Sequence, residues 1–466
     1  MSEQYPGGWV TKTPPTPSGP YYNSTAQGIW TLTQQAQLTV QGIWPTAGNN
    51  PPIYWIMTIA PPVVGSYTII GTQSTRGNVD SSGNYYPSFS MSPASGPYYA
   101  AWNIAKIDIN ANLIFTKSYT YTGADQGYLT NSIADSSNDL FVAGATGTNP
   151  YLGFYGKYNS SGTATWNFQT VDTDIYLTNF AGADSSGNLY YGGQDDLTAQ
   201  GVWLKTNSSG VRQASIRLSS PRPYAYLSHG AVNSSGVFLG GGTTIYEGYL
   251  VKLSASGAIT WSTTLGTGYG GTLSYAIVDP TFSYIYTVAK PVSSSNWSLY
   301  KIDGSNGTTV TWSKTSTDFP YYYGYLACDS SGNVYVLTQP NSSANVATIL
   351  KFNSSGTLQW QRNLTYTGAN LSPTSITIDN TNSVFILGMG LSTTPNRAVV
   401  IRLPTDGSQT GTYGSWAYAA SSYTISSGAS GTWATESFTT GTGVTSATST
   451  PTISATAFTA TATKIA

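Results

Sequence analysis

The stretch Asp329–Val336, "DSSGNVYV", decides the fold, and it directly follows Cys328, the single cysteine of the chain. An acid, two hydroxyls and a glycine beside a thiol would suit either a catalytic site or a reverse turn. The turn has a local physical basis, because an Asp side chain can cap its own turn and Gly or Asn accepts a positive φ. The rest of the chain decides between these two interpretations.

The same stretch recurs along the chain with small changes. Aligned on the first residue, successive copies lie 55, 49, 49, 46, 50 and 50 residues apart. The copies begin at Asp80, Asp135, Asp184, Asn233, Asp279, Asp329 and Asp379. A second motif follows each copy, as in "LKFNSSGTLQW", and its basic residue is Lys106, Lys157, Lys205, Lys252, Lys301, Lys351 or Arg402. Seven paired motifs at this period indicate seven repeats.

Each repeat alternates β-branched or aromatic runs with Asx-Ser-Ser-Gly turns, which is typical of four short strands. In the sixth repeat we expect them at 324–328, 333–338, 346–352 and 357–364. A tryptophan after the second turn (Trp166, Trp261, Trp312, Trp360) is expected to anchor the outer strand on the sheet face. The sequence therefore predicts an all-β, seven-bladed β-propeller with four-stranded blades, with six or eight blades as alternatives.

We assign residues 53–424 to the propeller. Ring closure needs a strand from one terminus, and two segments qualify: "YWIMTIA" at 54–60 and "GSWAYAA" at 414–420. The sequence does not choose between them. The most apolar window, 53–71, is interrupted by Pro61, Pro62 and Gly65, so we interpret it as two strands rather than a membrane span.

Two flanks lie outside the propeller. Residues 1–52 begin as Pro/Gly/Ser/Thr-rich coil, and Thr31 followed by Gln34 fits a capping box for a helix near 32–42. This short helix-containing part looks like an attachment segment, with candidate contacts Trp30, Leu32, Leu38 and Trp44. Residues 425–466 are rich in Thr, Ser and Ala. We expect either edge strands there or an extended tail that gains order against a partner.

Composition limits the classes of function. The 466 residues include 18 basic and 19 acidic ones, so the net charge is close to zero and only 8% of residues are charged. This argues against nucleic-acid binding and against polybasic membrane attachment. One cysteine excludes an internal disulfide and any multi-cysteine metal site. We therefore predict no metal, no cofactor and no enzymatic activity, with His229 as a packed residue and Cys328 as a buried small hydrophobe.

A candidate binding face emerges from acids and tyrosines that the repeat does not explain. They fall in loops that a propeller places on the face opposite the Ser-Ser-Gly turns. Half-exposed tyrosines beside acids suit sugars and protein interfaces, although they can also simply pack loops together. The candidates are Tyr121, Asp125, Asp172, Asp174, Tyr176, Asp195, Asp196, Tyr224, Tyr226, Tyr269, Tyr321, Tyr322 and Tyr323. A glycosidase or lyase is disfavoured because no pair of carboxylates outside the repeats stands out.

The paired "DSSGNVYV … LKFNSSGTLQW" units resemble the SBBP-type β-propeller repeats of bacterial surface proteins, over about 79–410. The segment "GIWTLTQQAQLTVQGIWP" resembles short Trp-bearing segments of marine bacteriophage virion proteins, including those of cyanophages. The start "MSEQYPGGWV" lacks the basic and apolar regions of an export signal, which fits a virion protein better than a secreted one.

These resemblances imply a non-enzymatic virion structural protein, such as a tail or head fibre or a capsid decoration, on the virion exterior. Its expected partners are other virion proteins, through the N-terminal segment and the C-terminal tail, and a host surface glycan or protein. We also expect a homo-oligomer within the assembly, no nucleic acid and no membrane span. The alternative is a bacterial cell-surface adhesin or a lectin-like carbohydrate-binding propeller in the extracellular space.

Overall fold

The computed structural model describes most of the propeller and parts of the flanks. The described residues are 4–5, 9–10, 25–26, 38–39, 55–60, 67–68, 77–93, 101–121, 127–135, 137–146, 152–170, 174–219, 226–233, 236–242, 248–265, 275–289, 297–319, 324–340, 344–379, 382, 384–392, 397–428, 433–435, 439–442, 446–447, 453–457 and 461–464. Among them, no helix is long and apolar enough to cross a membrane.

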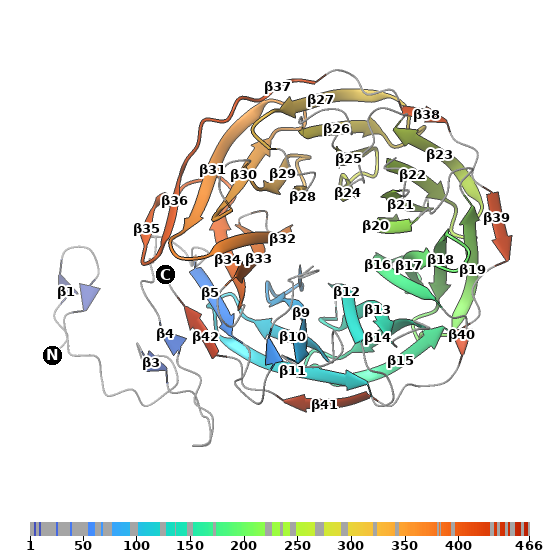
Figure 1. Ribbon diagram of the computed structural model, residues 1–466, viewed down its shortest axis with the longest axis horizontal. Coiled ribbons are helices and arrows are strands. Elements are labelled where there is room, and N and C mark those ends of the chain that lie inside the picture. Colours follow the sequence, from blue (N-terminus) through green and yellow to red (C-terminus); the bar gives the residue numbers. More distant parts are fainter. Residues whose placement is uncertain are drawn as a thin grey trace.

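The described strands form a ring of sheets around a central axis (Figure 1). Blade 1 contains β6 (Tyr67–Thr68), β7 (Asn78–Val79), β8 (Tyr85–Tyr86), β9 (Ser88–Pro93), β10 (Ala101–Ile107) and β11 (Leu113–Tyr121). Blade 2 contains β12 (Gly127–Ala134), β13 (Leu140–Thr146), β14 (Leu152–Tyr158) and β15 (Ala164–Thr170). Blade 3 contains β16 (Ile175–Ala183), β17 (Leu189–Asp195), β18 (Gln200–Thr206) and β19 (Arg212–Ser219).

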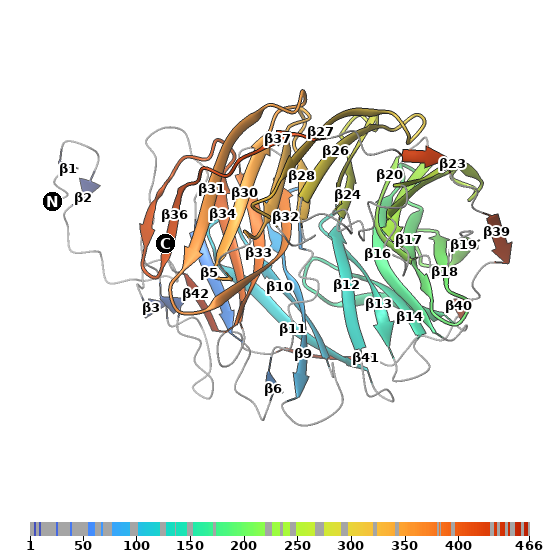
Figure 2. The same ribbon diagram turned by 45° about the horizontal axis from the view of Figure 1, so that its top comes forward.

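The ring continues with the same antiparallel pattern, and the tilted view shows the blades side by side (Figure 2). Blade 4 contains β20 (Tyr226–Asn233), β21 (Gly236–Gly242), β22 (Gly248–Leu253) and β23 (Ile259–Leu265). Blade 5 contains β24 (Tyr275–Val278), β25 (Tyr284–Ala289), β26 (Trp297–Asp303) and β27 (Val310–Ser316). Blade 6 contains β28 (Gly324–Cys328), β29 (Val334–Thr338), β30 (Val346–Phe352) and β31 (Leu358–Tyr366). Blade 7 contains β32 (Asn370–Ile378), β33 (Val384–Ser392), β34 (Arg397–Pro404) and β5 (Trp55–Ala60).

The last blade closes the ring with a strand from the N-terminal side. β5 pairs with β34, with Trp55 opposite Arg402 and Ile59 opposite Ala398. The competing segment near 414–420 has a different place, because β36 (Trp416–Ala420) pairs with β31 of blade 6. The apolar window at 53–71 contains β5 and β6, which confirms its interpretation as two strands.

The C-terminal strands form what we call the belt, residues 416–464. It runs backwards around the outside of the ring, through blades 6, 5, 4, 3, 2, 1 and finally 7 (Figure 1). Its strands are β36, β37 (Ser426–Ser427), β38 (Trp433–Thr435), β39 (Thr439–Thr442), β40 (Ser446–Ala447), β41 (Ile453–Ala457) and β42 (Thr461–Lys464). Each pairs antiparallel with the outer strand of one blade. Residues 425–466 thus form edge strands where they are described, which was one of the two expected alternatives.

The all-β propeller stands, but the predicted fold class needs three corrections. Only six blades come from one continuous stretch each, because blade 7 combines three strands of the last repeat with the distant β5. The blades are not four-stranded, since the belt adds an outer strand to every one of them. Local repeat patterns cannot reveal strands contributed from elsewhere in the chain.

The third correction concerns the N-terminal helix. The described residues contain no helix, and within 32–42 the described part is β4 (Leu38–Thr39), paired with β3 (Thr25–Ala26). A capping box gives little stability to so short a segment, and its β-branched residues favour strands. The remaining described pair is β1 (Gln4–Tyr5) with β2 (Trp9–Val10).

The opening motif is a reverse turn in which both oxygens of the Asp329 carboxylate accept hydrogen bonds. One carboxylate oxygen of Asp329 accepts bonds from the backbone N–H groups of Ser331 and Asn333, at 3.0 and 2.9 Å. The other accepts from the Asn333 amide at 2.8 Å and from the Tyr335 hydroxyl at 3.1 Å. Gly332 has a φ of +76°, which glycine adopts without strain. The motif is therefore a structural Asx turn.

Neighbouring blades are joined by what we call the inter-blade clamp. Between blades 5 and 6, the carbonyl oxygen of Ser354 accepts two bonds from the preceding blade. Lys301 Nζ donates at 2.8 Å and Trp312 Nε1 at 3.1 Å. The indole also covers Gly356, where a Cβ would meet the ring at 2.8 Å and where φ is +81°. The second turn of blade 6 thus receives the tryptophan of the blade before it.

Two further junctions carry the complete clamp. The carbonyl of Thr405 accepts from Lys351 Nζ at 3.1 Å and from Trp360 Nε1 at 3.2 Å. The carbonyl of Ile109 accepts from Trp55 Nε1 at 3.2 Å and from Arg402 at 3.3 Å. Three other junctions show one of the two bonds: Trp166 to Ser208, Lys205 to Ala255 and Trp261 to Gly304.

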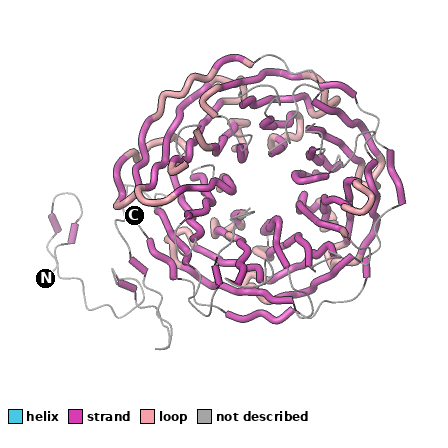
Figure 3. The backbone as a smooth tube through the Cα atoms, viewed as in Figure 1, coloured by secondary structure: helices cyan, strands magenta, loops and turns pink. Residues whose placement is uncertain are grey.

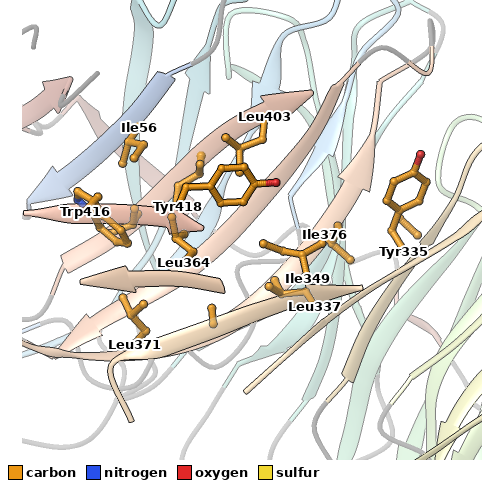
Figure 4. Packing of buried hydrophobic residues seen from close by; sticks show 14 residues of the cluster. Ile56, Tyr335, Leu337, Ile349, Leu364, Leu371, Ile376, Leu403, Trp416 and Tyr418 are labelled. Carbon is orange, nitrogen blue, oxygen red and sulfur yellow. The ribbon is translucent and has the colours of Figure 1, made fainter. Parts of the chain in front are cut away.

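The hydrophobic core lies between the sheets rather than on the axis. Figure 4 shows the cluster shared by blades 6 and 7, where Leu337 and Ile349 of blade 6 lie beside Ile376 of blade 7. Trp416 of the belt is fully buried in the same cluster. A single sheet could not bury these side chains, so each blade depends on its neighbours.

We expect Trp360→Phe to lower the free energy of unfolding by about 1 kcal/mol, because it removes one donor while keeping an aromatic ring. The Thr405 carbonyl keeps its bond from Lys351. Chemical denaturation measures the change. Gln359→Ala on the same strand is the control, since its side-chain bond stays within its own turn, and an equal loss in both variants would contradict the clamp.

We expect a chain ending at Gly428 to show a melting temperature lower by more than about 5 °C and to self-associate. The truncation removes β38 to β42 and leaves five blades with open outer edges. Calorimetry and light scattering measure both effects. Thr439→Ser with Thr440→Ser is the control, because it keeps the backbone ladder. An unchanged melting temperature and mass for the truncated chain would contradict the role of the belt.

Candidate functional site

A cavity of about 310 Å³ lies on the ring axis. Residues of the seven inner strands, β7, β12, β16, β20, β24, β28 and β32, line it, and Figure 3 shows these strands around the centre. The lining comes mostly from the half of each strand that leads into its first turn, such as Leu326–Cys328 before Asp329. The cavity therefore lies towards the face of the Asx turns.

Four inner strands contain a β-bulge at an equivalent position. The register shifts between Leu129 and Asn131 in β12, and corresponding shifts occur in β16, in β20 before His229 and in β32 before Ser375. A bulge inserts one residue and changes which side chains face a given direction. Asn131, His229 and Ser375 all follow such a shift, and all three line the cavity.

Buried polar side chains tie the cavity wall together across blades. The Asn131 amide donates to the carbonyl of Phe180 in the next blade, at 3.3 Å. The hydroxyls of Tyr85 and Ser375 lie 3.2 Å apart, between blades 1 and 7. Burial raises the pKa of Tyr85 to about 12, so this phenol stays neutral and can donate or accept a bond.

Three aromatic rings from successive blades extend along the wall. The rings of His229 and Tyr275 have centroids 4.6 Å apart, and those of Tyr275 and Tyr325 are 5.6 Å apart in an edge-to-face arrangement. His229 is 3% exposed. This confirms the prediction that His229 is a packed residue, and it also places His229 and Tyr275 on the cavity wall.

Cys328 is half-buried and lines the cavity, so the prediction that it is a buried small hydrophobe needs correction. Its Sγ lies 3.5 Å from the carbonyl oxygen of Asp329. Burial, with the nearby carboxylates of Asp329 and Asp279, raises the pKa of the thiol to about 12. The thiol is therefore protonated at neutral pH and is a weak nucleophile.

The described wall is built mainly from neutral side chains. Its lining residues include no Asp, Glu, Lys or Arg, while Asn131, Ser132, Ser375 and Thr377 contribute neutral polar groups. Among the described residues, no group of three or more His, Cys, Asp or Glu is placed to hold a metal ion.

Part of the predicted binding face does come together, in blade 3. Asp174 and Asp196 are joined by a 2.9 Å backbone bond, at the end of the blade opposite the Asp184 turn. Burial is the main cause that raises the pKa of Asp196, and the charges of Asp174 and Asp195 raise it further. The Tyr176 hydroxyl lowers the pKa of Asp196. These four predicted residues are thus neighbours.

Asp195 has a structural role within that group. It is buried, and its carboxylate pairs with Arg217 Nε at 2.7 Å and accepts from the backbone N–H of Thr198 at 3.0 Å. These bonds hold the loop that presents Asp196, which is exposed.

The other predicted face residues are dispersed or not described. Tyr121 and Tyr226 lie in strands β11 and β20 rather than in loops, and Tyr121 pairs with Ile453 of the belt. Asp125, Asp172, Tyr224, Tyr269, Tyr321, Tyr322 and Tyr323 lie outside the described residues, as do Trp30, Leu32 and Trp44 of the attachment segment. Leu38 lies in β4, next to β42 at the end of the belt.

Sequence reasoning missed Asn131, Tyr275 and Ser375 as cavity residues. A signal was present, because "YLTN" at 128–131 recurs as "YLTN" at 176–179 and "YLSH" at 226–229. Each copy spans the bulge and ends on the residue that follows it.

Comparisons with known proteins do not assign the chain to a family. No protein-family model matches the chain, and no curated protein matches it. Similar solved structures include the WD40 β-propeller domain of Doa1, with a TM-score of 0.40 and 9% identity over 64% of this chain and 88% of that one. Kuenenia stuttgartiensis hydrazine synthase has a TM-score of 0.47 and 11% identity, over 71% and 96%. An oligogalacturonate lyase in complex with manganese has a TM-score of 0.43 and 11% identity, over 78% and 98%. At these scores they carry no argument about function.

We expect alkylation of Cys328 by iodoacetamide at pH 8 to be at least about 100-fold slower in the folded chain than in the unfolded chain. The raised pKa keeps the thiol protonated until the pH approaches 12, whereas an unfolded cysteine ionises near 8.5. Mass spectrometry over time, with and without guanidinium, measures both rates. Rates within tenfold of each other would contradict this assignment.

Proposed function

We propose that this protein is a non-enzymatic structural component on the exterior of a virion, as a tail or head fibre or a capsid decoration. The observation that carries the proposal is the belt, which pairs with the outer strand of every blade. Open strand edges promote association between copies, and a chain with 8% charged residues and a net charge of -1 offers little charge repulsion to prevent it. A self-covered ring suits a protein displayed in many copies on a particle.

The attachment site in this proposal is the side of the ring at blade 7. There the closing strand β5, the last belt strand β42 and the N-terminal strand β4 lie side by side (Figure 1). The N-terminal segment mounts the propeller on other virion proteins from this side, and copies of the chain form a homo-oligomer in the assembly. The resemblances to SBBP-type repeats and to Trp-bearing phage segments support a surface role of this kind.

The resemblances also suggest that the exposed part of the ring contacts the host. The neighbouring Asp174, Tyr176 and Asp196 on the loop face are the described candidates for contact with a host glycan or protein. Such contacts would be weak singly and would gain strength from many copies on one particle.

Mass spectrometry of purified particles tests the proposal. We expect the protein in the particle fraction at a constant ratio to the major capsid protein. A chain lacking residues 1–52 is expected to keep a folded ring and to be lost from particles, while Gln359→Ala is incorporated normally. Recovery only in a bacterial envelope fraction would contradict the proposal and favour the surface adhesin.

A further inference from the structure

We propose that the axial cavity is a binding site for one neutral, hydroxyl-rich ring, such as a terminal monosaccharide unit. Nothing in the virion assignment is needed for this inference, because it rests on the size and chemistry of the cavity. Its volume of about 310 Å³ lies at the lower end of the range for small-molecule sites, which run from about 300 to 1,000 Å³.

The inner strands supply the first part of the recognition chemistry. In the described residues each of them pairs with strands of its own blade along one edge, and its other edge faces the axis. A strand edge presents backbone N–H donors and C=O acceptors in alternation. A sugar hydroxyl both donates and accepts, so it matches such an edge better than a purely anionic or purely cationic group does.

Side chains around the axis add neutral hydrogen-bonding groups. Asn131 and Ser375 reach the wall after their bulges, and Ser132 and Thr377 lie beside them in β12 and β32. Asn131 and Ser375 are 6% and 2% exposed, and both are fixed by bonds between blades. The polar groups are therefore preorganised, which lowers the entropic cost of binding.

The charge of the wall determines the class of ligand. A charged group placed there would lose its hydration with no carboxylate, ammonium or guanidinium group in the described lining to compensate, and such burial is costly. The ring of Tyr275, held between His229 and Tyr325, offers an aromatic surface for the apolar face of a sugar. We therefore expect neutral sugars to bind and their charged analogues to be rejected.

The test uses the full chain with the methyl glycosides of glucose, galactose and N-acetylglucosamine, and with glucuronate and glucosamine as charged comparators. Saturation-transfer NMR and titration give the affinities. We expect at least one neutral glycoside to bind with a dissociation constant of about 1 mM. Both charged sugars are expected to bind at least tenfold more weakly. Failure of every neutral glycoside to bind at tens of millimolar would overturn the proposal, as would equal binding of a charged one.

Two variants locate the site. Ala231→Leu fills part of the cavity, and Thr377→Val removes one hydroxyl at nearly constant volume, so both should weaken binding at least fivefold. Ala231 and Thr377 are half-buried, and circular dichroism verifies that the variants fold. If Ala231→Leu fails to fold, Thr377→Val alone decides the result.

Two further variants distinguish the cavity from the loop face. Gln359→Ala, at an exposed position near the start of β31, is the matched control and should bind as the parent chain does. Asp196→Asn changes the loop face without touching the axis. Loss of sugar binding in Asp196→Asn with unchanged binding in Thr377→Val would overturn the cavity as the site and favour the loop face.

Discussion

The inter-blade clamp is the interaction on which the rest of the structure depends. A lysine and a tryptophan of one blade donate to a single turn carbonyl of the next, as at Ser354 and Thr405. This carbonyl belongs to the tight second turn of the repeat, which is Asn-Ser-Ser-Gly at 353–356 and Pro-Thr-Asp-Gly at 404–407, so the geometry of the turn positions the acceptor. The repeated motif thus shapes one blade and binds its neighbour with the same few residues. This explains why the spacing of the two motifs is so regular.

The belt closes the ring from outside, in addition to the closure by β5. Its strands are two to five residues long and contain mostly Thr, Ser and Ala, so they add backbone bonds rather than a large hydrophobic core. Trp416 and Tyr418 of β36 differ from this pattern, because both lie buried between blades 6 and 7 and fix the point where the belt begins. Each belt strand makes only a short ladder of backbone hydrogen bonds with its blade. The belt therefore stabilises the ring only when its strands are joined in one continuous chain.

Each blade has two parts with different roles: the repeated turns maintain the structure, and the inner strand lines the cavity. At the turns, the acids are engaged in local bonds and in ion pairs such as Lys106 with Asp80 at 3.4 Å. Along the axis, the repeat is less regular, and bulges vary from blade to blade. Chemistry that requires one particular environment can therefore exist only where the repeats differ, as at His229 and Tyr275.

The sequence by itself determined the repeat, the Asx turns and the all-β propeller, because these follow from contacts between residues close in the chain. It assigned Asp174, Tyr176, Asp195 and Asp196 to one face of the ring together with many other residues, but the structure alone showed that these four are neighbours. Only the tertiary structure decided that β5 closes blade 7, that the belt covers every blade, and that Asn131 and Ser375 meet at the axis. Those contacts join residues that are far apart in the chain. A local sequence pattern does not indicate which distant strand a segment will pair with, or which part of the cavity wall it will contact.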